Sequence, residues 1–101
     1  MQKLEMENGV QILLKRAQFE YVMAVSNLTF MLRHAIENND NEFLKSDLFR
    51  DLEITMNVKR ESFSAMVSCV LLTLTGHTMS ELDYEFSNDY YVLEYEVKDN
   101  D

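Results

Sequence analysis

Two short stretches near the C-terminus alternate apolar and acidic residues, and this pattern constrains the fold more than any other feature of the chain. In residues 81–86 every second side chain is apolar and the others are carboxylates. Residues 91–97 repeat the alternation, with Glu94 and Glu96 among their polar positions. A period of two places one set of side chains on a core and the other in water. We therefore predict a β-hairpin over residues 80–97.

A helix over the same residues is the alternative, because some apolar side chains also recur at helical spacing. These are Leu82, Phe86, Tyr90, Leu93 and Val97. A helix would leave Tyr84, Tyr91 and Tyr95 off the apolar stripe, so the alternation favours the hairpin.

The loop between the two strands decides which side chains share a face. An even loop, either Asn88-Asp89 or residues 87–90, sets Tyr84 opposite Leu93 and Asp83 opposite Glu94, whereas an odd loop would mix the two faces. In the even register five carboxylates gather on one surface, which we term the acidic hairpin face. Its members are Glu81, Asp83, Glu85, Glu94 and Glu96.

The acidic hairpin face has two interpretations. It is either a solvated outer face that protects a sheet edge from aggregation, or a surface that binds a basic partner. Like charges directly opposite one another destabilise a sheet by about 0.2–1 kcal/mol per pair. Such repulsion gains nothing for the fold itself, which supports the binding interpretation. Acidic surfaces are common, however, and the sequence slightly favours the solvated outer face.

Residues 9–37 are predicted to form one long helix with apolar side chains on two opposite faces. The first face follows the alternating steps of four and three that are typical of packed helices. It contains Val10, Leu14, Ala17, Tyr21, Ala24, Leu28, Met31 and Ala35. At 100° per residue, four further apolar residues fall opposite this seam. They are Ile12, Phe19, Met23 and Phe30, and we predict that they mediate self-association.

A straight helix of this length measures about 42 Å, whereas a compact domain of this size is about 33 Å across. Three arrangements remain open. The helix breaks near Ser26-Asn27, it reaches into a second subunit, or its own domain wraps around it.

The middle of the chain predicts three further elements. A polar loop at residues 37–41 precedes a short helix through Phe43 and Phe49, with Asp40 or Asn41 as its cap. Residues 52–58 alternate apolar and polar side chains, which predicts a half-buried strand. Residues 63–74 form an apolar helix that ends at Gly76. The predicted fold class is α+β, with helices backing a three-stranded, mainly antiparallel sheet.

Composition narrows the classes of function. The 101 residues correspond to a single small acidic domain with a net charge of −9. Residues 76–101 hold one base and eight acids, so we expect no direct binding to nucleic acid or to anionic membranes. The lone Cys69 lies in an apolar stretch, which predicts a buried thiol, a reducing compartment and a cytoplasmic location. No stretch is long and apolar enough to span a bilayer.

The sequence offers little for catalysis. His34 and His77 are the two histidines, and neither lies in a cluster that would hold a metal ion. A flat strand face supplies no pocket to shift the pKa values of Asp83 and Glu94. We therefore predict a protein that is not an enzyme, with no cofactor, no metal and no catalytic residues.

The leading hypothesis is a non-catalytic protein-binding module whose acidic hairpin face engages a basic surface of another macromolecule. Residues two apart along a strand are about 6.7 Å apart, close to the spacing of phosphates along DNA. An inhibitor that mimics DNA and binds a nucleic-acid-binding protein is one version. The first alternative is an oligomeric structural adaptor or assembly chaperone, for example a homodimer, that uses the two-faced N-terminal helix. The second is a small ligand-binding domain or enzyme formed across a dimer interface.

Overall fold

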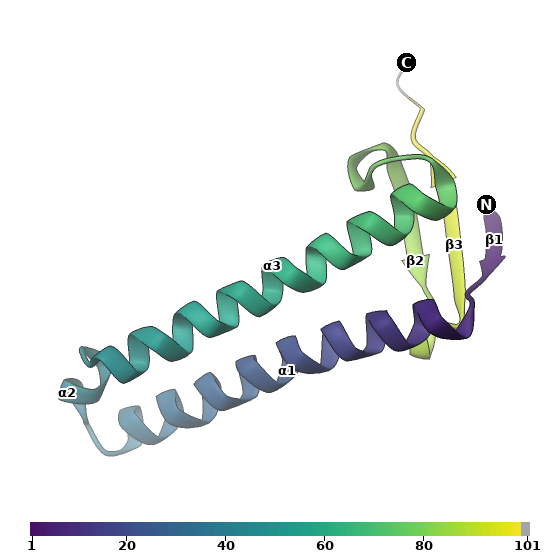
Figure 1. Cartoon of the computed structure of the whole chain (residues 1–101). Coiled ribbons are helices and arrows are strands. Elements are labelled where there is room, and N and C mark those ends of the chain that lie inside the picture. Colours follow the sequence, from purple (N-terminus) through teal and green to yellow (C-terminus); the bar gives the residue numbers. More distant parts are fainter. Residues whose placement is uncertain (100–101) are drawn as a thin grey trace. The chain divides into compact units, whose positions relative to one another are not determined.

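The computed structural model describes residues 1–99, and its elements fall into two units. The sheet unit comprises Met1–Arg16 and Ser64–Asp101, and the helix unit comprises Ala17–Phe63. Two long helices, α1 (Asn8–Glu37) and α3 (Asp47–Thr75), contribute residues to both units. The fold is α+β, as the sequence predicts (Figure 1).

The sheet has three antiparallel strands in the order β1-β3-β2. Strands β2 (Leu82–Phe86) and β3 (Val92–Val97) form the predicted hairpin, so the helical alternative for this segment is wrong. The third strand is β1 (Gln2–Glu5), which comes from the N-terminus and pairs with β3. Figure 1 shows β1 and β2 on either side of β3.

The strand predicted at residues 52–58 is wrong, because this segment lies inside α3. Leu52 and Met56 are half-buried, whereas Ile54 and Val58 are exposed. Residues two apart on a helix point about 200° away from each other. Apolar side chains that alternate with polar ones over seven residues are therefore also compatible with a helix that has two apolar faces. In this segment the chain forms the helix.

The hairpin register differs from the predicted one by two residues but keeps its parity. Tyr84 lies opposite Tyr95, and Glu85 lies opposite Glu94. The loop is even, because Ser87 N–H donates to the Val92 carbonyl at 2.8 Å and encloses residues 88–91. The shift lets Tyr90 turn inward, where it is 8% exposed and its ring lies 5.3 Å from that of Phe86.

That turn requires an uncommon backbone conformation. Asp89 and Tyr90 have φ values of 62° and 57°, in the left-handed region that costs roughly 1–2 kcal/mol per residue. The buried aromatic ring offsets this cost. Burial also raises the pKa of the Tyr90 phenol above its ordinary value of 10.0.

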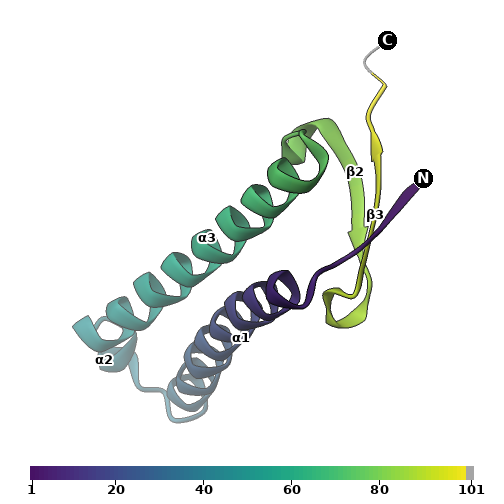
Figure 2. The same cartoon turned by 45° about the vertical axis from the view of Figure 1, so that its right-hand side comes forward.

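The main core lies in the sheet unit. The first turns of α1 and the last turns of α3 lie on the same side of the sheet (Figures 1 and 2). The buried apolar residues of this unit are Met6, Leu14, Val67, Val70, Leu71, Leu82, Tyr90 and Leu93. Helix α3 ends at Thr75, and Gly76 follows with a φ of +77°, as predicted for a glycine at a helix C-terminus.

In the helix unit, α1 and α3 run side by side (Figure 1). The predicted seam residues of α1 in this unit are all buried or half-buried: Ala17, Tyr21, Ala24, Leu28, Met31 and Ala35. The Tyr21 and Phe63 rings lie 6.2 Å apart, and Lys59 Nζ lies 3.4 Å from Glu20 Oε2. Helix α1 is continuous through residues 26 and 27, which excludes the arrangement with a break there. A short helix, α2 (Asn41–Leu44), is capped by Asp40, whose Oδ1 accepts from Phe43 N–H at 3.0 Å.

Candidate functional site: the acidic sheet face

The outer face of the sheet carries most of the predicted carboxylates. Asp83 of β2 lies opposite Glu96 of β3, and Glu85 lies opposite Glu94. All four point to the face opposite Leu82 and Leu93, because side chains alternate along a strand. Because the hairpin loop has an even number of residues, the carboxylates of β2 lie directly opposite the carboxylates of β3.

Strand β1 adds a carboxylate and a base that the sequence pattern does not predict. Lys3 lies opposite Glu94, and Glu5 lies opposite Val92. Lys3 Nζ is 3.5 Å from Glu94 Oε1, with 71% of the lysine side chain exposed. An exposed ion pair of this kind contributes about 0–1 kcal/mol. The name acidic face is used below for Glu5, Asp83, Glu85, Glu94 and Glu96.

Glu81 is set apart from these five residues. It belongs to the 3-10 turn η1 (Met79–Glu81) that precedes β2. Its Oε1 accepts from Thr78 N–H at 2.9 Å and from the Thr78 hydroxyl at 2.8 Å, and its Oε2 lies 3.4 Å from His77 Nδ1. The Thr78 hydrogen bonds, followed by His77, lower the pKa of Glu81 below its ordinary value of 4.5. Its carboxylate therefore caps a turn, whereas the sequence pattern predicts it among the partner-binding residues.

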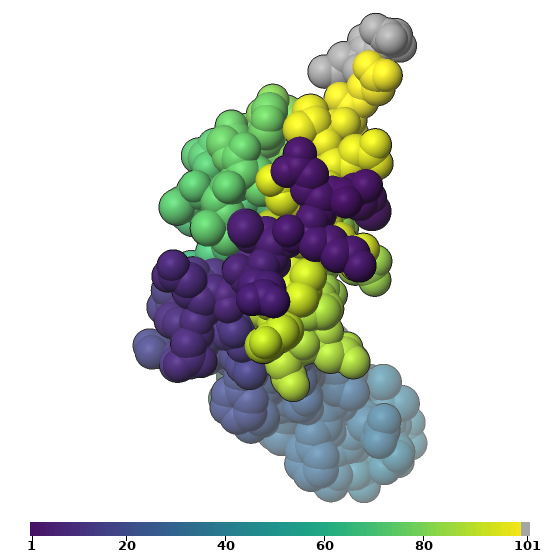
Figure 3. Space-filling model, turned by 90° about the vertical axis from the view of Figure 1, so that its right-hand side faces the viewer, coloured from purple at the N-terminus to yellow at the C-terminus, as the bar shows by residue number. Residues whose placement is uncertain are grey.

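The carboxylates of the acidic face are solvent-exposed, except for the half-buried Glu94. A shallow depression of about 210 Å³ is lined by Glu85, Ser87, Val92 and Glu94 together with Phe86. Neighbouring strands lie about 4.8 Å apart, and residues two apart along a strand about 6.7 Å. The carboxylates thus form a grid that suits several lysine or arginine side chains better than one enclosed ligand. Figure 3 shows the N-terminal segment, in purple, lying against the yellow β3 strand.

The residues predicted for self-association are all solvent-exposed. Ile12 is 50% exposed and belongs to the sheet unit. In the helix unit, the exposed fractions are 63% for Phe19, 44% for Met23 and 69% for Phe30.

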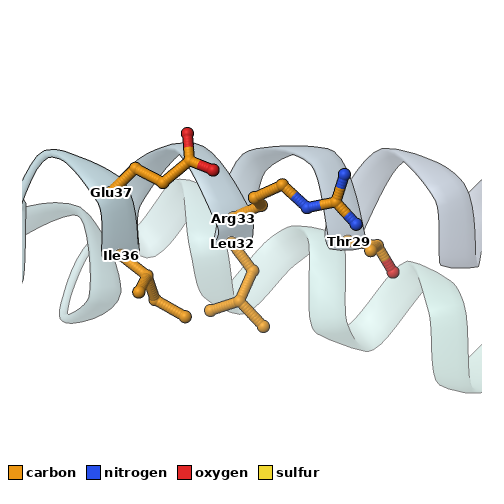
Figure 4. Close-up of a pocket in the computed structure, with 5 residues that line it drawn as sticks. All are labelled: Thr29, Leu32, Arg33, Ile36 and Glu37. Carbon is orange, nitrogen blue, oxygen red and sulfur yellow. The ribbon is translucent and has the colours of Figure 1, made fainter.

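Further hollows lie outside the sheet, and two of them are lined mainly by apolar side chains. One, in the helix unit, has a volume of about 320 Å³ and is lined by α1 residues. Leu32 and Ile36 extend to one side of the helix there, and Glu37 extends to the other (Figure 4). The other hollow, of about 260 Å³, is apolar and includes Val10 and Cys69. Cys69 is exposed, so the predicted burial of its thiol is wrong.

Within residues 1–99, no three or more histidine, cysteine or acidic side chains are arranged to hold a metal ion. Over the same residues, no helix combines the length and apolar character that crossing a bilayer requires.

No protein-family model, no curated protein and no solved structure matches this chain.

Proposed function

We propose that this protein is a non-catalytic binding module whose acidic face engages a basic surface of another protein. The observation that carries the proposal is the pairing of Asp83 with Glu96 and of Glu85 with Glu94 across β2 and β3. Each like-charged pair costs the fold roughly 0.2–1 kcal/mol. A cationic partner converts that repulsion into attraction, and the attraction between complementary charges also speeds association.

The uneven distribution of charge supports the same function. The sheet unit holds four bases and ten acids, a net charge of −6, whereas the helix unit holds five bases and eight acids, a net charge of −3. A basic partner is therefore attracted mainly to the sheet unit.

Mimicry of nucleic acid is the narrower form of this proposal. The spacing of about 6.7 Å between alternate strand residues supports it. The partner would then be a nucleic-acid-binding protein, and DNA would compete with the acidic face for the same surface. A cytoplasmic location is part of the proposal, because a free, exposed Cys69 suits a reducing compartment.

The test compares two charge reversals that change the net charge equally. One variant combines Glu94→Lys with Glu96→Lys on the acidic face. The control combines Glu53→Lys with Glu61→Lys, two exposed residues of α3. The probe is a fluorescent oligo-arginine peptide, titrated at several salt concentrations.

We expect the face variant to weaken peptide binding at least roughly tenfold relative to the control. Salt should weaken binding to the native protein, because exposed charges are screened over about 10 Å at 0.1 M. Equal losses in the two double variants would show that net charge alone attracts the peptide, and the acidic face would lose its assigned role.

A further inference from the structure

The helix unit has little core of its own. Of the apolar residues that are buried in the described chain, Ala35 is the one that belongs to this unit. Eight large apolar side chains of the unit are between 44% and 69% exposed. They are Phe19, Val22, Met23, Phe30, Ile36, Leu48, Ile54 and Val58. A helix with apolar side chains on two faces is ordinarily covered on both, so another molecule is expected to cover the outer side.

Three of these side chains form a single stripe on α1. At 100° per residue, Phe19, Met23 and Phe30 point within about 40° of one another. The stripe faces roughly opposite Tyr21 and Ala35, which belong to the seam with α3. The name outer α1 stripe is used below for Phe19, Met23 and Phe30.

We propose that the outer α1 stripe binds the same stripe of a second copy, in antiparallel orientation, about a twofold axis between Ser26 and Asn27. A twofold interface must be complementary to itself. Met23 and Phe30 lie at equal distances from the midpoint of residues 26 and 27, so each methionine meets a phenylalanine of the other copy. Sulfur and aromatic rings make favourable contacts, and the small Ser26 at the axis allows the helices to approach closely.

Charge is compatible with this pairing. Glu20, which also pairs with Lys59 of its own chain, lies along one edge of the stripe. His34 lies on the same edge at nearly the same distance beyond the midpoint. In an antiparallel pair, the same edges of the two helices face each other. A carboxylate then faces an imidazole rather than another carboxylate. The helix unit also carries the smaller share of the net charge, −3 of −9, so repulsion between copies is weaker here than at the acidic face.

The first test is the mass of the full-length chain in solution, measured by sedimentation equilibrium. We expect twice the chain mass of 11.9 kDa at micromolar concentration. Phe30→Asp should raise the dissociation constant at least roughly a hundredfold, as the loss of a central aromatic contact does in other interfaces. The matched control is Ile54→Asp on α3, where the native side chain is 52% exposed, and it should remain dimeric. The proposal is overturned if the native protein is a monomer. It is also overturned if Ile54→Asp dissociates the dimer while Phe30→Asp leaves it intact.

The second test, disulfide crosslinking, does not require a dissociating variant to fold. All variants carry Cys69→Ser. Ser26→Cys should give a covalent dimer on mild oxidation, because the two copies of residue 26 meet near the axis. Phe30→Cys alone should not form a covalent dimer, because the two copies of residue 30 are offset by about 10 Å along the helices. A disulfide spans a Cα separation of at most about 7 Å. A mixture of Phe30→Cys with Met23→Cys should crosslink. Failure of Ser26→Cys, or self-crosslinking of Phe30→Cys, would refute the antiparallel pairing.

Discussion

Leu71 and Leu72 are consecutive residues of α3 with opposite environments, and their truncation tests where the core lies. Leu71 is 0% exposed, whereas Leu72 is 53% exposed. Leucine and alanine have similar helix propensities, so a change to alanine at either position reports mainly on packing. Leu71→Ala removes a fully buried side chain and leaves a cavity, which costs about 3–4 kcal/mol. Leu72→Ala opens no enclosed cavity, and we expect it to cost at most about 1 kcal/mol.

Urea unfolding followed by circular dichroism measures both losses, at one fixed protein concentration because self-association would add to stability. With a slope of about 1–3 kcal/mol/M, a loss of 3 kcal/mol lowers the urea midpoint by roughly 1–3 M. Leu72→Ala should move the midpoint by less than half as much. If Leu72→Ala proves as costly as Leu71→Ala, the assignment of the core to the Leu71 face of α3 is refuted.

Three further perturbations test the turns and the acidic face. Gly76→Ala should lower the free energy of unfolding by about 1–2 kcal/mol, because Gly76 has a φ of +77°; an unchanged urea midpoint would contradict this reason. Glu85→Lys places opposite charges across β2 and β3, and it should stabilise the fold by a few tenths to about 1 kcal/mol, with the gain shrinking in high salt. Because the folded-state pKa of Glu81 is lowered, its charged form stabilises the fold above about pH 4.5, and this contribution is lost as the pH falls through the folded-state pKa. The difference in stability between the native protein and Glu81→Gln should therefore narrow in acid, and a pH-independent difference in urea midpoints would contradict it.

The hairpin was predictable because the alternation of apolar and acidic residues is a local pattern. An even number of loop residues then determines which side chains share a face of the sheet. Apolar side chains alternate along both strands, and a shift of two residues in register moves no side chain to the other face. The exact pairing was not predictable. It depends on the burial of Tyr90, and the preceding carboxylates give no indication of which loop residue turns inward.

The other errors have a common physical origin. The segment around Ile54 and Val58 alternates because a helix with two apolar faces also alternates over short lengths. Strand β1 has four residues and pairs with β3, which lies about 90 residues further along the chain. Pairing over such a sequence distance is not encoded in the local residue pattern of β1. Because β1 was missed, Glu5 and Lys3 were absent from the predicted site, although Asp83, Glu85, Glu94 and Glu96 were placed together correctly.

The two proposed surfaces lie in different units of the chain, and this separation gives them a joint consequence. A homodimer formed through the outer α1 stripe carries two acidic faces and twice the net charge of −9. A partner with one basic surface would bind each face independently, so Phe30→Asp should leave its affinity per site unchanged. A partner with repeated basic surfaces, such as an oligomeric nucleic-acid-binding protein, would gain avidity of roughly 10²–10⁴ when its spacing matches. Measuring one basic probe in monovalent and in surface-immobilised form, with native protein and with Phe30→Asp, separates these cases. Avidity that persists in a monomeric Phe30→Asp variant would show that the second copy has no part in binding.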